Sequence, residues 1–158
     1  MSRIAPCLWF ADEAEQAANY YVSLMPDARI DHVQRAVADS PGNVEGGVLM
    51  VAFTIGGNRF LALNGGIRFE YTHAISLHFE CADQAELDRL WEGLSAGGSI
   101  EQCGWLKDRY GVSWQIVPRA LGEMLADPDA AKAKRVMQAM LGMHKIDIAA
   151  LERARDAA

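Results

Sequence analysis

The chain has 158 residues, of which 51% are hydrophobic and 23% are charged. This is the composition of a folded globular protein, and the length fits one domain or two small modules that share a core. Acidic residues outnumber basic ones by 21 to 15, so the net charge of −6 argues against nucleic acid or an anionic membrane as a partner.

The first half of the chain is predicted to contain one helix among four strands. Residues 4–10 are apolar and aromatic, which favours a strand. Asp12 stands where an N-cap would, and apolar residues follow it at helical spacing until Pro26. Three further strands are expected, over residues 28–36, 47–55 and 59–63, with Gly56-Gly57-Asn58 as a hairpin turn between the last two.

The second half repeats this order. Residues 74–81 are predicted to form a strand, and Asp83 with Glu86 resembles a capping box at the start of a helix. Glycines at 97 and 98 end that helix, and strands are expected over residues 99–106 and 112–117. We expect the charged segment between these strands, residues 107–111, to be a solvated turn.

This recurrence indicates an internal repeat and an α+β fold. Leu8-Trp9-Phe10 is similar to Leu77-His78-Phe79, and each half reads strand, helix, then two or three strands. The predicted boundaries are 1–66 and 67–118 for the two modules and 119–158 for a helical C-terminal extension. In that extension Asp127 is the expected N-cap of a helix that ends at Gly142, and Asp147 caps a last short helix. Methionines at 137, 140 and 143 either pack on the sheet or form a subunit contact.

Three segments carry a resemblance to a known family: Pro-Cys-Leu-Trp-Phe at 6–10, Asn-Tyr-Tyr at 19–21 and Gly-Trp-Leu-Lys-Asp-Arg-Tyr-Gly-Val-Ser-Trp-Gln-Ile-Val-Pro at 104–118. They resemble the PhnB-like, or demethylubiquinone methyltransferase-like, branch of the vicinal-oxygen-chelate superfamily, the group of the glyoxalases, bleomycin-resistance proteins and extradiol dioxygenases. The tail at 127–151 looks like this branch too. The resemblance implies two βαβββ modules whose curled sheets enclose a pocket, and a homodimer.

The resemblance also implies where a metal would bind, because each module of the metal-using relatives supplies ligands, typically His and Glu, from its first and last strands. The matching positions here fall on Pro6, on Ser76, within residues 60–64 and on Gln115. None of these residues is a His or an acid. We therefore expect the metal box to be lost and predict no metal and no other cofactor.

The remaining candidate site residues follow from strand alternation. His78 shares a strand face with Ser76, so it is either a general base with a pKa near neutrality, a displaced ligand, or a half-buried structural histidine. Trp105 is a candidate for stacking on a flat ligand, and Asn64 for a ligand loop with the glycines that follow it. Trp9 and Trp114 are predicted to be core, and the other histidines to lie on the surface.

Three functional hypotheses result. The first is a metal-independent protein that binds a small molecule through Ser76, Gln115, Trp105 and Asn64. The second is an enzyme for a small oxygenated substrate, with His78 as base or with a metal at shifted ligands. The third is a dimeric protein whose methionine-rich tail serves interaction. Methyl transfer is not expected, because no Gly-rich loop joins a strand to a helix as S-adenosylmethionine binding requires.

Three cysteines without paired spacing indicate a reducing compartment. The N-terminus lacks the apolar stretch of a signal peptide, and no stretch approaches the ~20 apolar residues of a membrane span. We therefore expect a cytoplasmic protein.

Overall fold

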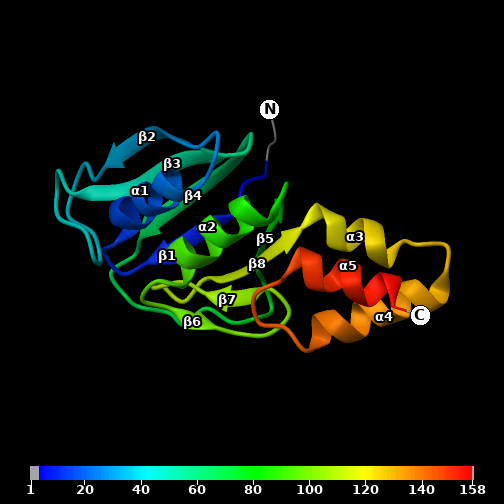
Figure 1. Cartoon of the computed structure of the whole chain (residues 1–158). Coiled ribbons are helices and arrows are strands. Elements are labelled where there is room, and N and C mark those ends of the chain that lie inside the picture. The colour runs from blue at the N-terminus through cyan, green and yellow to red at the C-terminus, as the bar shows by residue number, and fades with distance from the viewer. Residues whose placement is uncertain (1–3, 158) are drawn as a thin grey trace. The chain divides into compact units, whose positions relative to one another are not determined.

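The structure is a computed structural model that describes residues 4–157. The chain divides into two compact units, Met1–Glu70 and Tyr71–Ala158, and each carries a four-stranded sheet and helices (Figure 1). None of the helices within residues 4–157 combines the length and the apolar character that a membrane crossing demands.

The first unit is a βαβββ module. Its sheet has the strand order β1-β4-β3-β2, in which β1 runs parallel to β4 and the other pairs are antiparallel. Helix α1 packs on one face, where Tyr21 stacks on Phe53 of β3. The elements are β1 (Cys7–Phe10), α1 (Ala14–Leu24), β2 (Arg29–Arg35), β3 (Val48–Ile55) and β4 (Asn58–Asn64).

The second unit begins with the same topology. Its sheet has the order β5-β8-β7-β6, again with the first strand parallel to the last, so the internal repeat is a repeat of architecture. The predicted strand over 99–106 is wrong in one respect: Cys103 and Gly104, both at positive φ, break it into two short strands. The elements are β5 (Leu77–Cys81), α2 (Gln84–Ser95), β6 (Ser99–Ile100), β7 (Trp105–Lys107) and β8 (Ser113–Pro118).

Helix α2 starts as its sequence predicts. The Asp83 carboxylate accepts a hydrogen bond from the Glu86 backbone N–H at 2.9 Å, and the Glu86 carboxylate reaches back to the backbone N–H of Ala82 at 2.7 Å. Leucines at 87, 90 and 94 then recur at helical spacing and are fully buried. The apolar stripe of α2 therefore faces the second sheet.

A three-helix extension follows the second sheet, and its helices lie together in Figure 1: α3 (Arg119–Leu125), α4 (Ala130–Leu141) and α5 (Ile148–Asp156). The sequence analysis missed α3. It also placed the N-cap of α4 at Asp127, but the cap is Asp129, whose carboxylate accepts from the backbone N–H groups of Ala131 and Lys132. Asp147 caps α5 as predicted, although this helix continues well beyond Leu151.

The segment between α4 and α5 attaches the extension to the sheet. The backbone N–H groups of Cys103 and Gly104 donate to the carbonyls of Met143 and His144, both at 2.8 Å. Two residues on, the side chain of Ile146 is fully buried. The extension is thus bound to the β6–β7 connection by backbone pairing and by an apolar anchor.

Replacing this anchor is expected to destabilise the second unit. Ile146→Ala leaves a cavity at a fully buried site, so we expect a loss of about 2–5 kcal/mol in the free energy of unfolding. Urea denaturation followed by circular dichroism measures the loss. Leu141→Ala, at a side chain of α4 that is 56% exposed, is the matched control. Equal effects of the two substitutions would contradict the anchoring role of Ile146.

Candidate functional site

Strand register gathers four of the predicted site residues on one face of the second sheet. His78 of β5 lies opposite Gln115 of β8, and Gln115 lies opposite Trp105 of β7. Ser76 directly precedes β5 and shares the face of His78, because successive side chains of a strand alternate. The sequence analysis placed Ser76 and His78 on one strand face, and the register adds Gln115 and Trp105 to that face, whereas the roles of all four stay predictions.

The opposite face of this sheet packs against α2. Leu106 and Ile116 are fully buried there, and the side chain of Trp114 is 3% exposed, as expected for a core residue. Cys81 also points to this side, where charged groups of α2 act on its thiol. The residues that alternate with this apolar set consequently form a separate face, which we call the polar face: Ser76, His78, Trp105, Lys107, Ser113 and Gln115.

On the polar face, the amide of Gln115 donates a hydrogen bond to the Ser76 hydroxyl, with 2.9 Å between Nε2 and Oγ. Both side chains are half-buried, as is Trp105, whereas His78 is exposed. A serine hydroxyl can accept and donate at once, so Ser76 keeps its own O–H for another acceptor. The pair is thus a neutral, hydrogen-bonding element with two donors left, the Ser76 O–H and the second amide N–H of Gln115, and with one carbonyl oxygen.

Ser113 is a member of the polar face that the sequence analysis missed. It alternates with Gln115, and its register partner on β7 is Lys107. The side chain is only 1% exposed, and within residues 4–157 its Oγ is the one buried side-chain oxygen or nitrogen without a hydrogen-bond partner. A buried hydroxyl left unpaired costs about 1–3 kcal/mol of stability. The signal in the sequence was its two-residue spacing from Gln115.

Asp108 corrects the prediction of a solvated turn between β7 and β8. Its side chain is 2% exposed, and its two oxygens accept from the backbone N–H groups of Tyr110 and Val112 and from the indole N–H of Trp114, at 2.8–3.1 Å. A carboxylate with three donors can be buried, because hydrogen bonds replace its hydration. The residue type indicated exposure, and only the fold brings these donors together.

Asn64 belongs to the first unit and to the face of its sheet that α1 covers. Its Oδ1 accepts from the backbone N–H of Ala14 at 2.8 Å, and its Nδ2 donates to the carbonyl of Val48 at 2.9 Å. The amide thus serves the first turn of α1, and we leave Asn64 out of the proposed ligand site. This contact also explains why Asp12 is not the N-cap: the cap position is Glu13, which makes no side-chain cap.

The face of the first sheet that lies away from α1 is mainly apolar, whereas the polar face of the second sheet is hydrophilic. The parallel pair β1–β4 places Trp9 opposite Leu63 and Cys7 opposite Leu61. Trp9 is half-buried, so its prediction as core is wrong: its indole N–H donates to the carbonyl of Ile67, and a side chain at Gly65 would collide with the ring. Gly65 thus makes room for Trp9, whereas Gly66 lies against the backbone of Gly42.

Two predicted surface histidines meet one glutamate at the rim of the second sheet. His73 Nε2 lies 2.8 and 2.9 Å from the two carboxylate oxygens of Glu101, and His144 Nδ1 lies 2.9 Å from the Glu101 carbonyl. Both histidines are exposed. Within residues 4–157, no three His, Cys, Asp or Glu side chains gather closely enough to hold a metal ion.

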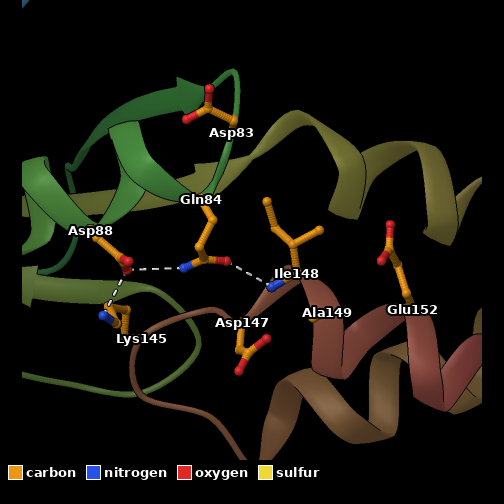
Figure 2. A pocket seen from close by; sticks show the side chains of 8 residues that line it. All are labelled: Asp83, Gln84, Asp88, Lys145, Asp147, Ile148, Ala149 and Glu152. Carbon is orange, nitrogen blue, oxygen red and sulfur yellow. Dashed lines mark hydrogen bonds and ion pairs between the residues drawn. The ribbon is translucent and has the colours of Figure 1, made fainter.

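A groove of about 500 Å³ lies where the N-terminus of α2 meets the segment before α5 (Figure 2). Gln84 donates to Asp88 and accepts from the backbone N–H of Ile148, and Lys145 forms an ion pair with Asp88 at 2.6 Å. The Lys145 ammonium and the Gln84 amide hold the pKa of Asp88 below its ordinary value. These polar groups are hydrogen-bonded or ion-paired to one another across the groove, so we do not assign a ligand to the groove.

The chain matches one family model and several solved structures. The model described as 3-demethylubiquinone-9 3-methyltransferase matches residues 2–117. A PhnB protein from Bacillus cereus, which carries the same methyltransferase description, is 32% identical, with a TM-score of 0.68 over 74% of this chain and 99% of its own. A protein from Pseudomonas aeruginosa is 20% identical, with a TM-score of 0.61 over 75% of this chain and 98% of its own. No curated protein matches the chain.

The fosfomycin resistance protein FosX from Listeria monocytogenes shares the fold at 15% identity, with a TM-score of 0.52 over 78% of this chain and 97% of its own. Two βαβββ modules of this kind define a protein of the vicinal-oxygen-chelate superfamily. Within it, the chain belongs to the PhnB-like family whose model it matches. The match ends at residue 117, so the resemblance of the tail to this family stays a prediction.

The assignment of Cys81 to the face of the second sheet that α2 covers can be tested by thiol labelling. Burial raises the pKa of the Cys81 thiol to about 12, and the side chain is buried on the face that α2 covers. With iodoacetamide at pH 8 we expect Cys81 to stay unmodified in the folded protein and to react after denaturation. Desolvation by its neighbours also raises the pKa of the Cys7 thiol. Because Cys7 is nevertheless an exposed residue, it should react before Cys81. Peptide mass spectrometry reads both sites, and early labelling of Cys81 would contradict the register of β5.

Proposed function

We propose that the polar face of the second sheet binds a small oxygenated molecule without the help of a metal ion. One observation carries the proposal: Gln115 and Ser76 are hydrogen-bonded to each other at 2.9 Å. By the family resemblance, these are positions at which metal-using relatives carry their ligands. A neutral amide paired with a hydroxyl is a poor ligand set for a transition metal, so the donor chemistry does not fit one.

The same pair is suited to an oxygen-bearing ligand. Ser76 keeps a hydroxyl proton, and Gln115 keeps its second amide proton and its carbonyl oxygen, so the two side chains together offer two donors and one acceptor. Trp105 lies across β8 from His78, both in register with Gln115, and its indole offers an apolar surface for a ring or chain. A few polar groups beside an aromatic wall are typical of small-molecule sites.

Methyl transfer is not part of the proposal, although the family description names a methyltransferase. S-adenosylmethionine-type sites need a glycine-rich loop between a strand and a helix. Within residues 4–157 a loop joins a strand to a helix at Ala11-Asp12-Glu13 before α1 and at Ala82-Asp83 before α2, while β8 passes into α3 with no residue between them. The two loops contain acidic residues and no glycine.

Metal-free binding can be measured with catechol, which carries two adjacent oxygens. After dialysis against EDTA we expect catechol to shift amide NMR signals of the polar face. Gln115→Ala should weaken its binding about threefold to tenfold, the effect of losing one neutral hydrogen bond. Gln138→Ala, at an exposed position of α4, is the matched control. Binding that appears only after addition of Mn²⁺ or Ni²⁺ would overturn the metal-free proposal.

A second candidate function is proton abstraction by His78. The imidazole is exposed and lies in register with Gln115, where it can reach a bound ligand. Dihydroxyacetone in D₂O is a direct probe, because a base that removes its C–H proton leaves deuterium in its place. We expect exchange above the buffer rate in the wild type and its loss in His78→Ala, with His32→Ala unaffected. An exchange rate that His78→Ala leaves unchanged would exclude this role.

A further inference from the structure

We propose that Ser113 and Lys107 hold an anionic oxygen group of the ligand, a carboxylate or a phosphonate. The inference rests on the proposed function of the polar face and adds the chemical class of its ligand. It starts from the buried hydroxyl of Ser113, which has no partner within residues 4–157. Buried polar groups almost always have partners, so an orphan on a candidate binding face points to a partner that arrives from outside the chain.

The neighbours of this hydroxyl decide what kind of partner fits. Lys107 lies opposite Ser113 on β7, and continuing the register of β5 by one residue places Ser76 beside it on the other flank. All three side chains emerge on the same side of the sheet. The group therefore combines the ammonium of Lys107 with the two hydroxyl protons of Ser113 and Ser76.

The charges on this face favour an anion. Lys107 forms no ion pair within the described residues. The carboxylate of Glu80, which alternates with His78 on β5, is paired with Arg119 at 3.1 Å. Asp108 is turned toward Trp114 on the other face. Three neighbouring donors on one face, one of them cationic, match the oxygens of a terminal carboxylate or phosphonate, because charge-assisted hydrogen bonds are the strong ones.

This arrangement also explains why an unpaired hydroxyl is tolerated. Ser113 is covered by its surroundings, and its neighbour Lys107 is half-buried, with a long side chain that has four rotatable bonds. A ligand oxygen reaches Ser113 when the Lys107 side chain turns aside, while Gln115 stays bonded to Ser76. The unpaired Ser113 hydroxyl lowers the stability of the free protein, and a hydrogen bond to the ligand removes that penalty in the bound protein. Ser113→Ala should therefore raise stability and lower affinity, a combination that a merely structural serine would not produce.

The test compares benzoate and phenylphosphonate with neutral benzyl alcohol, which shares the ring but lacks the charge. For the wild type at low salt we expect both anions to bind about tenfold or more tightly than the alcohol, as followed by amide NMR shifts on β7 and β8. Lys107→Met should remove most of this preference, with Lys134→Met on α4 as the matched control. The tighter anion identifies whether the group is a carboxylate or a phosphonate.

Ser113→Ala supplies the second measurement. We expect its melting temperature to rise by about 2–4 °C and its benzoate affinity to fall about threefold to tenfold. Ser23→Ala, at an exposed position of α1, should change neither. A lower melting temperature, an unchanged benzoate affinity, or equal binding of benzyl alcohol and benzoate to the wild type would each overturn the inference. If catechol shifts the polar face while the anions gain nothing, only this inference fails. If no probe binds that face, the proposed function fails with it.

Discussion

A buried carboxylate controls the orientation of the strand on which the site depends. Asp108 accepts from two backbone N–H groups of the β7–β8 turn and from the indole of Trp114, so it holds Trp114 toward α2. Because side chains alternate along a strand, that orientation sends Ser113 and Gln115 to the other side. A slip of one residue would bury both polar side chains against the apolar stripe of α2 and expose Trp114. The polar face therefore exists because this turn is locked.

The two modules share one topology, but the side chains on one face of each sheet differ in polarity. In each, the first strand runs parallel to the last, and matching register pairs are Trp9 with Leu63 and His78 with Gln115. The scaffold positions of the repeat are thus retained while the side chains on the faces away from α1 and α2 differ: apolar in the first module, hydrogen-bonding in the second. This divergence is what one expects when the core faces carry the fold and the other faces are free to specialise.

The C-terminal helices are attached to the second module at the edge of its sheet. Backbone pairing of Cys103 and Gly104 with the α4–α5 connection, and the contacts of Gln84 with Ile146 and Ile148, tie them to the sheet and to the first turn of α2. The solved PhnB protein from Bacillus cereus is covered over nearly its whole length by only 74% of this chain. The family model likewise matches residues 2–117, a range that holds nearly all of both sheets and none of the C-terminal helices.

The sequence by itself determined the repeat, the α+β class, the caps at Asp83 and Asp147, and the shared face of Ser76 and His78. These are local signals, since periodicity and capping act within a few residues. It did not determine which polar side chains would be hydrogen-bonded to distant segments and which would be left without a hydrogen-bond partner. The burial of Asp108, the structural task of Asn64 and the orphaned hydroxyl of Ser113 depend on atoms brought together from distant segments or on side chains packed over them, and only the tertiary structure decided them.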